Sequence, residues 1–352
     1  MNRRNLLRAL AGLGALVSSR LSLADQPRSG RPRRIGLLPD LNFEQLEWFK
    51  DAMRRLGWSE GRDFTLVASG VSLGPRAEPL NTRMVVAPSR ASPEGIPTNT
   101  KRLLDSNPDL ILATSTAYAV AAHNASATTP VVMWTGGYPV EAGIANSLAQ
   151  PGKNVTGTSI YAGTGIWGKL IELLWTAKPT IKTVGVLWDY LPPAFPAAEM
   201  ELCYSELRRA EGILGVRVHL APVSDSRQLD EALSSLEAKG ADALLVTSGW
   251  ALLDVRQRVM DYAATKRLPL IVDFRWKGYL DPYPLLVYGA VQNELMQSAA
   301  SYVVKILEGA RAGDLPVLQP ARFELVVNLR TAKRIGLEIP KSILLRADSV
   351  VE

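Results

Sequence analysis

Hydroxyl and aromatic side chains follow several of the short apolar stretches that predict β-strands. Thr114, Ser115 and Thr116 stand just before a predicted helix, where side-chain oxygens and free N–H groups can hold a carboxylate. Ligands of open parallel sheets bind beyond the carboxyl ends of the strands, so these positions predict a ligand cleft between two lobes. Any single candidate residue at a strand end could equally be a residue at the rim of a sheet core. The other candidates at strand ends are Trp134, Tyr138, Trp188, Asp189, Trp250, Asp273 and Trp276.

The chain offers few residues for catalysis. Its two histidines, His123 and His219, have no His, Cys or Glu at metal-ligand spacing. Cys203 falls on the apolar face of a predicted helix, which is typical of a buried structural thiol. The sequence contains neither a G-x-S-x-G turn nor a P-loop. We therefore expect a protein that is not an enzyme and that holds no metal and no cofactor.

One motif supports an alternative. Gly163, Gly165 and Gly168 satisfy G-x-G-x-x-G, a predicted helix follows, and Asp189 comes about twenty residues on, as in a dinucleotide site. An exported nicotinamide-dependent oxidoreductase is therefore the rival hypothesis. Against it, residues 154–160 are too polar and too interrupted by glycine for the buried central strand that the motif requires. No catalytic acid or base to accompany such a cofactor is evident.

Strands and helices alternate along the chain, which predicts βαβ crossovers and an α/β fold with parallel sheets covered on both faces. Residues 69–99, rich in Pro, Ser and Gly, predict a loop or an irregular insertion. Strands are predicted at 34–39, 64–68, 110–113, 131–134, 183–188, 216–220, 241–247 and 268–274, and helices at 44–56, 118–126, 166–177, 197–211, 226–238 and 252–265.

Length and composition agree with a two-domain globular protein. At roughly 100–200 residues per domain, 352 residues suggest two folding units. One cysteine excludes an internal disulfide. The net charge is +6, but Arg3, Arg4, Arg8 and Arg20 supply four of the 40 basic residues, and the remaining 36 nearly balance 34 acidic ones. Such a balance lacks the basic surface that nucleic acid binding needs, so nucleic acid is not an expected partner.

The N-terminus has the parts of a secretory signal: a charged start, the apolar run at 6–17 and a small-x-small site ending at Ala24. The apolar run is too short to span a bilayer. Arg3 and Arg4 also fit the twin-arginine export pattern, and a Sec signal with two arginines remains equally open. We expect residues 1–24 to be cleaved after Ala24 and the protein to be periplasmic.

Three blocks of sequence carry a family resemblance. They are LGWSEGRDFT at 56–65, GGYPVEAGIANSLAQPGKNVTGT at 136–158, and the dense C-terminal block at 315–352. In these blocks the chain resembles the substrate-binding proteins of bacterial ABC transporters and is similar to the tryptophan-binding type. The resemblance covers the mature chain except for residues 69–99.

The resemblance implies a type I periplasmic binding fold, with two Rossmann-like lobes joined by a three-segment hinge. Lobe 1 would comprise residues 33–155 plus 290–316, and lobe 2 residues 156–289 plus 317–352. The hinge segments would lie near 154–159, 286–290 and 315–320. Residues 292–308 would return to the first lobe and 323–329 to the second.

The function that the resemblance implies is capture of a small molecule, an amino acid or an aromatic or organic acid, by hinge closure. The partners would be an inner-membrane ABC permease and its ATPase, with the binding protein itself a monomer. The ligand-sensing module of a receptor would share this fold and remains an alternative. One departure concerns Tyr138, which stands where the family commonly has an aspartate, so the ligand type of better-known members does not carry over directly. Asp273 or Arg275 could supply compensating charge.

Overall fold

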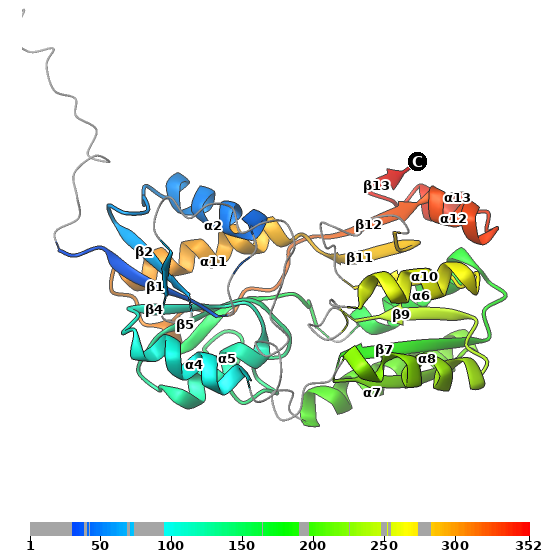
Figure 1. Cartoon of the computed structure of the whole chain (residues 1–352), viewed down its shortest axis with the longest axis horizontal. Coiled ribbons are helices and arrows are strands. Elements are labelled where there is room, and N and C mark those ends of the chain that lie inside the picture. Colours follow the sequence, from blue (N-terminus) through cyan, green and yellow to red (C-terminus); the bar gives the residue numbers. More distant parts are fainter. Residues whose placement is uncertain are drawn as a thin grey trace, which may run out of the picture.

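The computed structural model describes residues 30–38, 41, 43–68, 71–73, 95–163, 165–189, 197–224, 226–247, 252, 255–273 and 283–352. These residues form two lobes that lie side by side, each with one β-sheet between helices (Figure 1). Most strand pairs in both sheets are parallel. The predicted α/β class with parallel sheets in two lobes is therefore confirmed.

The first lobe is built on a six-stranded sheet with the order β3-β2-β1-β4-β5-β6. All pairs are parallel except β2 with β3, which is antiparallel. The apolar side chains of β4 and of the start of β5 are fully buried because helices cover both faces of the sheet. The strands are β1 (Arg33–Leu38), β2 (Phe64–Ala68), β3 (Val71–Leu73), β4 (Leu110–Ala113), β5 (Val131–Gly136) and β6 (Val155–Ser159).

Two pairs of helices cover this sheet. On one face α2 (Phe43–Arg55) packs beside α11 (Gln292–Leu307), although almost 240 residues separate them in sequence (Figure 1). On the other face lie α4 (Gly95–Asp105) and α5 (Thr116–Ala125). Each pair encloses its own hydrophobic core, so the sheet is buried on both sides.

The second lobe is built on a seven-stranded sheet with the order β13-β12-β11-β10-β9-β7-β8. Its pairs are parallel except β11 with β12, which is antiparallel. This pair is antiparallel because the chain leaves the lobe at the end of β11 and re-enters beside that point, where Ala290 pairs with Phe323 at the start of β12. The strands are β7 (Thr183–Asp189), β8 (Arg217–Val223), β9 (Ala243–Val246), β10 (Leu270–Val272), β11 (Leu286–Ala290), β12 (Phe323–Asn328) and β13 (Ser349–Val351).

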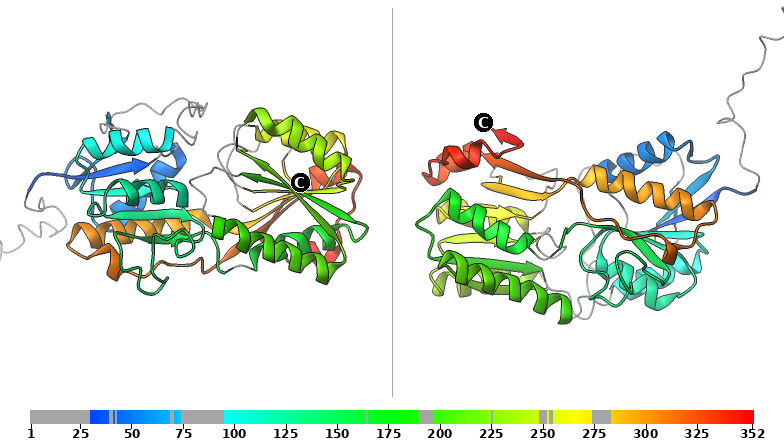
Figure 2. Two further views of the ribbon diagram at one scale, coloured as in Figure 1. Left: turned by 90° about the horizontal axis from the view of Figure 1, so that it is seen from below. Right: turned by 180° about the vertical axis from the view of Figure 1, so that it is seen from behind.

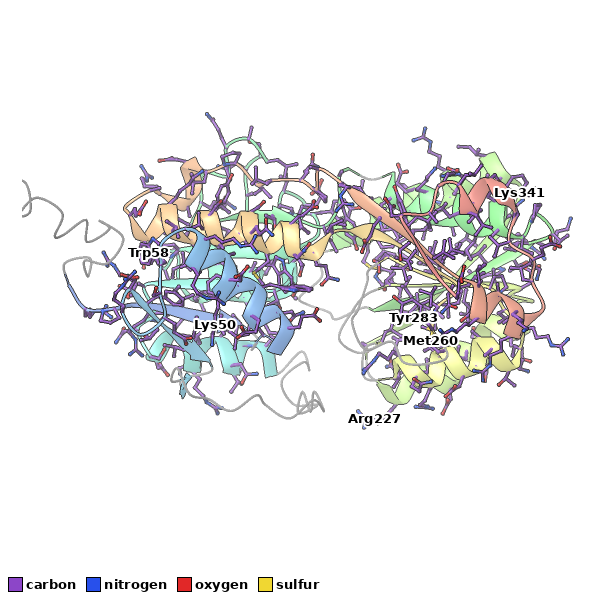
Figure 3. The ribbon with its side chains drawn as sticks, turned by 90° about the horizontal axis from the view of Figure 1, so that it is seen from above. Lys50, Trp58, Arg227, Met260, Tyr283 and Lys341 are labelled. Atoms are coloured by element: carbon purple, nitrogen blue, oxygen red, sulfur yellow. The ribbon has the colours of Figure 1, made fainter. Side chains whose placement is uncertain are left out.

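Helices also cover both faces of the second sheet. Met260 of α10 belongs to the core on one face of this sheet, and the partly buried Tyr283 packs against the same core (Figure 3). The Tyr283 carbonyl accepts a 2.6 Å hydrogen bond from Thr331 Oγ1. One face carries α6 (Ile166–Ala177), α7 (Ala197–Leu214), α12 (Leu329–Ile335) and α13 (Lys341–Leu344), and the other carries η2 (Ser226–Gln228), α8 (Leu229–Ala238) and α10 (Arg256–Thr265).

The chain passes between the lobes after β6, at Val291 between β11 and α11, and after η3 (Ala312–Asp314) (Figure 2). Two of the expected hinge ranges, 154–159 and 286–290, coincide with β6 and β11, and the passage begins where each strand ends. The third segment is bonded to the first, because the Leu318 N–H donates to Gly157 O over 2.9 Å and the Ser159 N–H donates to Leu318 O over 2.8 Å. The residue boundaries of the two lobes stay a prediction.

The interpretation of residues 154–160 as unsuited to a buried central strand needs correction in part, because they contain a strand that is buried but not central. Val155–Ser159 form β6, whose five residues are all buried at the edge of the first sheet. The polar side chains are accommodated because their hydroxyls bond to backbone carbonyls: Thr156 Oγ1 donates to Leu315 O over 2.7 Å, and Thr158 Oγ1 donates to Trp134 O.

The interpretation of residues 69–99 as irregular also needs correction in part. Val71–Leu73 form β3, and α4 begins at Gly95 inside this range. Residues 69–70 and 74–94 lie outside the described residues. Leu56, the last residue of the helix predicted at 44–56, follows the end of α2 and is exposed.

Candidate functional site

Three hydroxyl residues follow β4 and begin α5, as the sequence predicts. Thr114 is 7% exposed, and its hydroxyl is buried without a hydrogen-bond partner among the described residues. Its backbone is well fixed, because its N–H donates to Leu38 O over 3.0 Å and its carbonyl accepts from Thr135 Oγ1. The orphaned hydroxyl is therefore held in place at the carboxyl end of the sheet.

Ser115 occupies the N-cap of α5 but does not cap it. An N-cap serine normally accepts a hydrogen bond from a backbone N–H of the first turn. Here the side chain makes no such bond, and Ser115 Oγ is buried without a partner among the described residues. Two adjacent hydroxyls thus lack partners beside a helix N-terminus, which is a favourable place for an anion.

Thr116 has a different part in this arrangement. Its Oγ1 accepts a 2.6 Å hydrogen bond from the backbone N–H of Gly137, in the loop after β5. The Gly137 carbonyl in turn accepts a 2.8 Å bond from Ser159 Oγ at the end of β6. Thr116 therefore joins the start of α5 to the carboxyl ends of two neighbouring strands.

Glycines make this close approach of β5 and β6 possible. The register of the pair shifts between Met133 and Gly136, which marks a bulge. Gly157 has φ +128°, and a Cβ at that position would overlap the backbone of Met133. The bulge therefore needs glycine at position 157 of β6.

Aromatic rings from both lobes pack in one row at the ends of the sheets. Tyr138 stacks on Tyr161, with ring centroids 5.2 Å apart. Tyr161 meets Trp167 at 5.4 Å, and Trp167 meets Trp188 at 4.8 Å. Trp167 Nε1 also donates to the Tyr138 hydroxyl over 3.1 Å. We call Tyr138, Tyr161, Trp167 and Trp188 the aromatic row.

The aromatic row connects the lobes. Tyr138 follows β5 of the first sheet but lies in the core cluster of the second lobe, where it is 6% exposed. Trp167 belongs to α6, and Trp188 lies near the end of β7. The carboxyl ends of strands from both sheets therefore meet in this region.

Asp273 lies just past β10, at the same end of the second sheet. It is 3% exposed, and its Oδ2 accepts a 3.2 Å hydrogen bond from the Tyr161 hydroxyl. A buried carboxylate requires hydrogen bonds or a cationic partner to be stable. Asp273 and the hydroxyl pair of Thr114 and Ser115 thus place groups suited to opposite charges at the ends of the two sheets.

Of the remaining predicted site residues, one lies in the core of the first lobe, and the side chains of the others lie outside the described residues. Trp134 is 1% exposed in the core of the first lobe, where its Nε1 donates to Gln292 O over 3.2 Å and its ring meets Trp48 edge-on at 6.5 Å. Asp189 is the last residue of β7, and its side chain lies outside the described residues. Trp250, Trp276 and Arg275 also lie outside them.

Sequence reasoning missed Tyr161 and Trp167. Tyr161 comes two residues after β6 ends, so recognising β6 as a strand would have placed it with the other strand-end aromatics. Trp167 lies inside the G-x-G-x-x-G motif, which is defined by its glycines alone.

The G-x-G-x-x-G motif does not lie in a βαβ unit. The strand before it, β6, belongs to the first sheet, whereas the helix after it, α6, packs in the second lobe. A dinucleotide fingerprint needs its strand and helix in one unit, so that the helix N-terminus meets the pyrophosphate beside the sheet. The glycines instead begin the passage between the lobes.

Other chemistry-bearing residues have structural contacts. His123 Nδ1 lies 2.5 Å from Asn154 Oδ1, while Asn154 Nδ2 donates to Ser126 O and Thr129 O. Cys203 is buried in the second core. Among the described residues, no three His, Cys, Asp or Glu side chains gather as metal ligands. No helix in that part of the chain is long and apolar enough to cross a membrane.

Solved structures share this fold. An ABC domain from Streptococcus pneumoniae in complex with L-Trp matches with a TM-score of 0.71 and 21% identity, over 90% of this chain and all of that one. A conserved domain protein from Vibrio cholerae matches with a TM-score of 0.74 and 21% identity, over 91% and 100%. The fold is that of the type I periplasmic binding proteins.

Comparison of sequences identifies the family. The model of the family described as ABC transporter substrate binding protein matches residues 77–351, so the chain belongs to this family. The chain is also 30% identical over 230 residues to a tyrosine-binding protein of Clostridioides difficile. That match covers 65% of this chain and only 64% of the length of the relative.

Proposed function

We propose that this chain is the periplasmic solute-binding component of an ABC uptake system and that it captures an amino acid by closing its two lobes. The observation that carries the proposal is the pair of buried, unpartnered hydroxyls of Thr114 and Ser115 at the N-terminus of α5. A buried polar group without a partner costs stability, roughly 1–3 kcal/mol, so a native site that retains two of them favours a ligand that completes them.

A carboxylate fits this end of the site. Its oxygens accept hydrogen bonds, and both hydroxyls can donate. The first-turn N–H groups of an α-helix have no intrahelical acceptor, and the helix dipole favours negative charge there. Ser115 leaves these donors uncapped by its own side chain. The ligand carboxylate would bind here.

Asp273 would bind a cationic group of the same ligand. It is buried at the end of β10, in the lobe opposite α5. A molecule with a carboxylate for one lobe and an ammonium for the other would be gripped only when the lobes approach each other. An α-amino acid has both groups on one carbon.

The named relatives support an aromatic amino acid. The curated relative is called a tyrosine-binding protein, and the structure from Streptococcus pneumoniae holds L-Trp. Trp250 and Trp276, which follow two strands of the second lobe in sequence, would supply packing surfaces for a ring. The rings of the aromatic row are instead packed against one another.

Closure would act by population shift. The ligand binds the closed form better because only there does it meet groups from both lobes, so binding moves the equilibrium toward closure. The closed form would then be recognised by an inner-membrane permease driven by its ATPase. The ligand leaves chemically unchanged.

A binding screen tests this proposal. Thermal unfolding of the purified protein is followed with L-tyrosine, L-tryptophan, other amino acids, organic acids and sugars, and isothermal titration then measures affinity for the compounds that stabilise it. We expect aromatic amino acids to raise the midpoint most, because a ligand that binds only the folded state stabilises it. Stabilisation by sugars alone, or by no amino acid, would contradict the proposal.

A further inference from the structure

Tyr161 links the two charged-group sites of the proposed ligand cleft. Its hydroxyl donates to Asp273 Oδ2 over 3.2 Å, and its ring stacks on Tyr138 at 5.2 Å and an interplanar angle of 29°. The residue before Tyr138 is Gly137, whose N–H donates to Thr116 Oγ1 over 2.6 Å. A continuous line of contacts therefore runs from the first turn of α5 to the carboxylate of Asp273.

The position of Tyr161 in the chain is as informative as its contacts. It stands two residues past β6, in the first segment that passes between the lobes. Its backbone is held to the first lobe, because the Tyr161 N–H donates to Ser159 Oγ over 3.1 Å and Ser159 Oγ donates to Gly137 O. Its side chain is held to the second lobe through Asp273 and Trp167.

We propose that Tyr161 is a positioning residue that holds the Asp273 carboxylate toward the ligand and thereby makes the site selective for zwitterionic amino acids over the corresponding acids without an amine. This inference rests on the proposed function. The phenol donor fixes one carboxylate oxygen, so the other is oriented by the geometry of Tyr161. The stack on Tyr138 holds the Tyr161 ring against the loop after β5, and Gly137 of that loop is bonded to Thr116.

This arrangement accounts for Tyr138 in place of an acidic residue. The Tyr138 hydroxyl accepts a hydrogen bond from Trp167 Nε1, and the Tyr138 ring stacks on Tyr161. The hydroxyl and the ring of Tyr138 therefore both contact other members of the aromatic row. In this chain Asp273 supplies an acidic group at the strand ends of the second lobe, and Tyr138 supports the residue that orients it.

The test compares two ligands on one variant. Titration calorimetry measures the affinity of Tyr161→Phe for L-tyrosine and for 3-(4-hydroxyphenyl)propionate, which has the same ring and carboxylate but no amine; L-tryptophan and indole-3-propionate form a second pair. Tyr161→Phe keeps the ring that stacks on Tyr138 and removes the hydroxyl that donates to Asp273. We expect the preference for the amino acid to fall about tenfold, since a hydrogen bond to a charged group has this effect on affinity, while affinity for the acid is unchanged.

Tyr262→Phe is the matched control. The Tyr262 hydroxyl donates to Glu237 Oε2 over the same 3.2 Å, but this pair lies between the surface helices α8 and α10. Its removal should leave both affinities unchanged. In the Asp273→Asn background, Tyr161→Phe should have no further effect on the preference, because the group that Tyr161 orients has lost its charge.

The outcomes separate the two proposals. If Tyr161→Phe weakens both ligands alike, or leaves the preference as it is in the unmodified protein, the positioning role is overturned while the binding function stands. If the unmodified protein binds both ligands of a pair equally well, selection for the amine is overturned. If it binds none of the four probes, the proposed function fails and this inference fails with it.

Discussion

The side chain of Thr116 accepts a 2.6 Å hydrogen bond from the backbone N–H of Gly137, which joins the start of α5 to the loop after β5. The hydroxyls of its neighbours Thr114 and Ser115 are buried and have no hydrogen-bond partner among the described residues. Of these three consecutive hydroxyl residues, one is bonded to the backbone of the protein, and the other two are the ones that we propose as donors to a ligand.

This division predicts opposite effects of removing each hydroxyl. Thr114→Val and Ser115→Ala should weaken ligand binding by about tenfold each, because hydrogen bonds to a charged carboxylate are lost, and should leave the unfolding midpoint unchanged or higher. Thr116→Val should lower the midpoint, since the buried Gly137 N–H loses its acceptor. Titration calorimetry and thermal unfolding measure both quantities. Thr180→Val, at an exposed position, is the control.

Effects on stability in place of ligand affinity would contradict the proposed role of Thr114. If Thr114→Val lowers stability as much as Thr116→Val and leaves affinity unchanged, the Thr114 hydroxyl is a structural group and not a ligand donor.

Gly157 is predicted to be intolerant of alanine. Its φ of +128° is strained for any other residue, and a Cβ would overlap the Met133 backbone. Gly157→Ala should therefore lower the free energy of unfolding by at least about 2 kcal/mol, measured by urea denaturation. Gly143→Ala separates the two causes, because Gly143 also has a positive φ, +71°, but open space around its Cβ position. It should cost about 1 kcal/mol. Equal losses in the two variants would show that the clash with Met133 is unimportant.

The apolar strands of the fold could be predicted from sequence, whereas β6 could not. The stretches at 110–113 and 183–188 are runs of apolar residues that become buried parallel strands, and they appear within one residue of the predicted bounds. The β6 sequence VTGTS is polar, and it is buried only because Thr156 and Thr158 bond to carbonyls at Leu315 and Trp134. Partners at such separations along the chain leave no local pattern.

The candidate site shows the same limit. The location of Thr114 and Ser115 between the end of β4 and the start of α5 could be predicted, because an apolar strand pattern precedes them and a helix follows. The burial of Trp134 in the first core could not be predicted, because its indole N–H bonds to Gln292 O, 158 residues away in sequence. Tyr161 was missed because the strand before it, β6, was not predicted, and Trp167 because no local pattern marks its contact with Tyr138.

Trp188 is predicted to act through packing. It is 4% exposed, and its ring meets Trp167 at 4.8 Å. Trp188→Ala should destabilise the protein by about 3–5 kcal/mol, the usual cost of deleting a buried aromatic side chain. Trp188→Phe, which keeps a ring against Trp167, should cost clearly less. Urea denaturation of both variants tests this, and a Trp188→Ala protein of unchanged stability but weakened ligand binding would assign Trp188 to the ligand instead.

Tyr302 connects stability to alkaline pH. Tyr302 lies in α11, and its hydroxyl donates to Pro316 O over 2.8 Å. This bond attaches α11 to the third segment that passes between the lobes. Burial raises the pKa of Tyr302 above its ordinary value of 10.0, so the folded state favours the neutral phenol. Its contribution to stability is therefore fully present below pH 10 and is lost as the pH rises through the raised pKa.

Tyr302→Phe should consequently cost about 1 kcal/mol at pH 7 and lose less stability than the unmodified protein above pH 10. Urea denaturation at pH 7 and at pH 10.5 measures the difference. Burial also raises the pKa of Tyr262 and Tyr288, so part of the alkaline loss should remain in the variant. An identical loss with and without the Tyr302 hydroxyl would contradict the prediction.

Binding of an amino acid should bring the two lobes of this protein together. Small-angle X-ray scattering of the purified protein, with and without a saturating concentration of the amino acid that binds most tightly, measures this directly. Closure of the lobes should give a smaller radius of gyration with the ligand bound. The same scattering curve at full occupancy would contradict it.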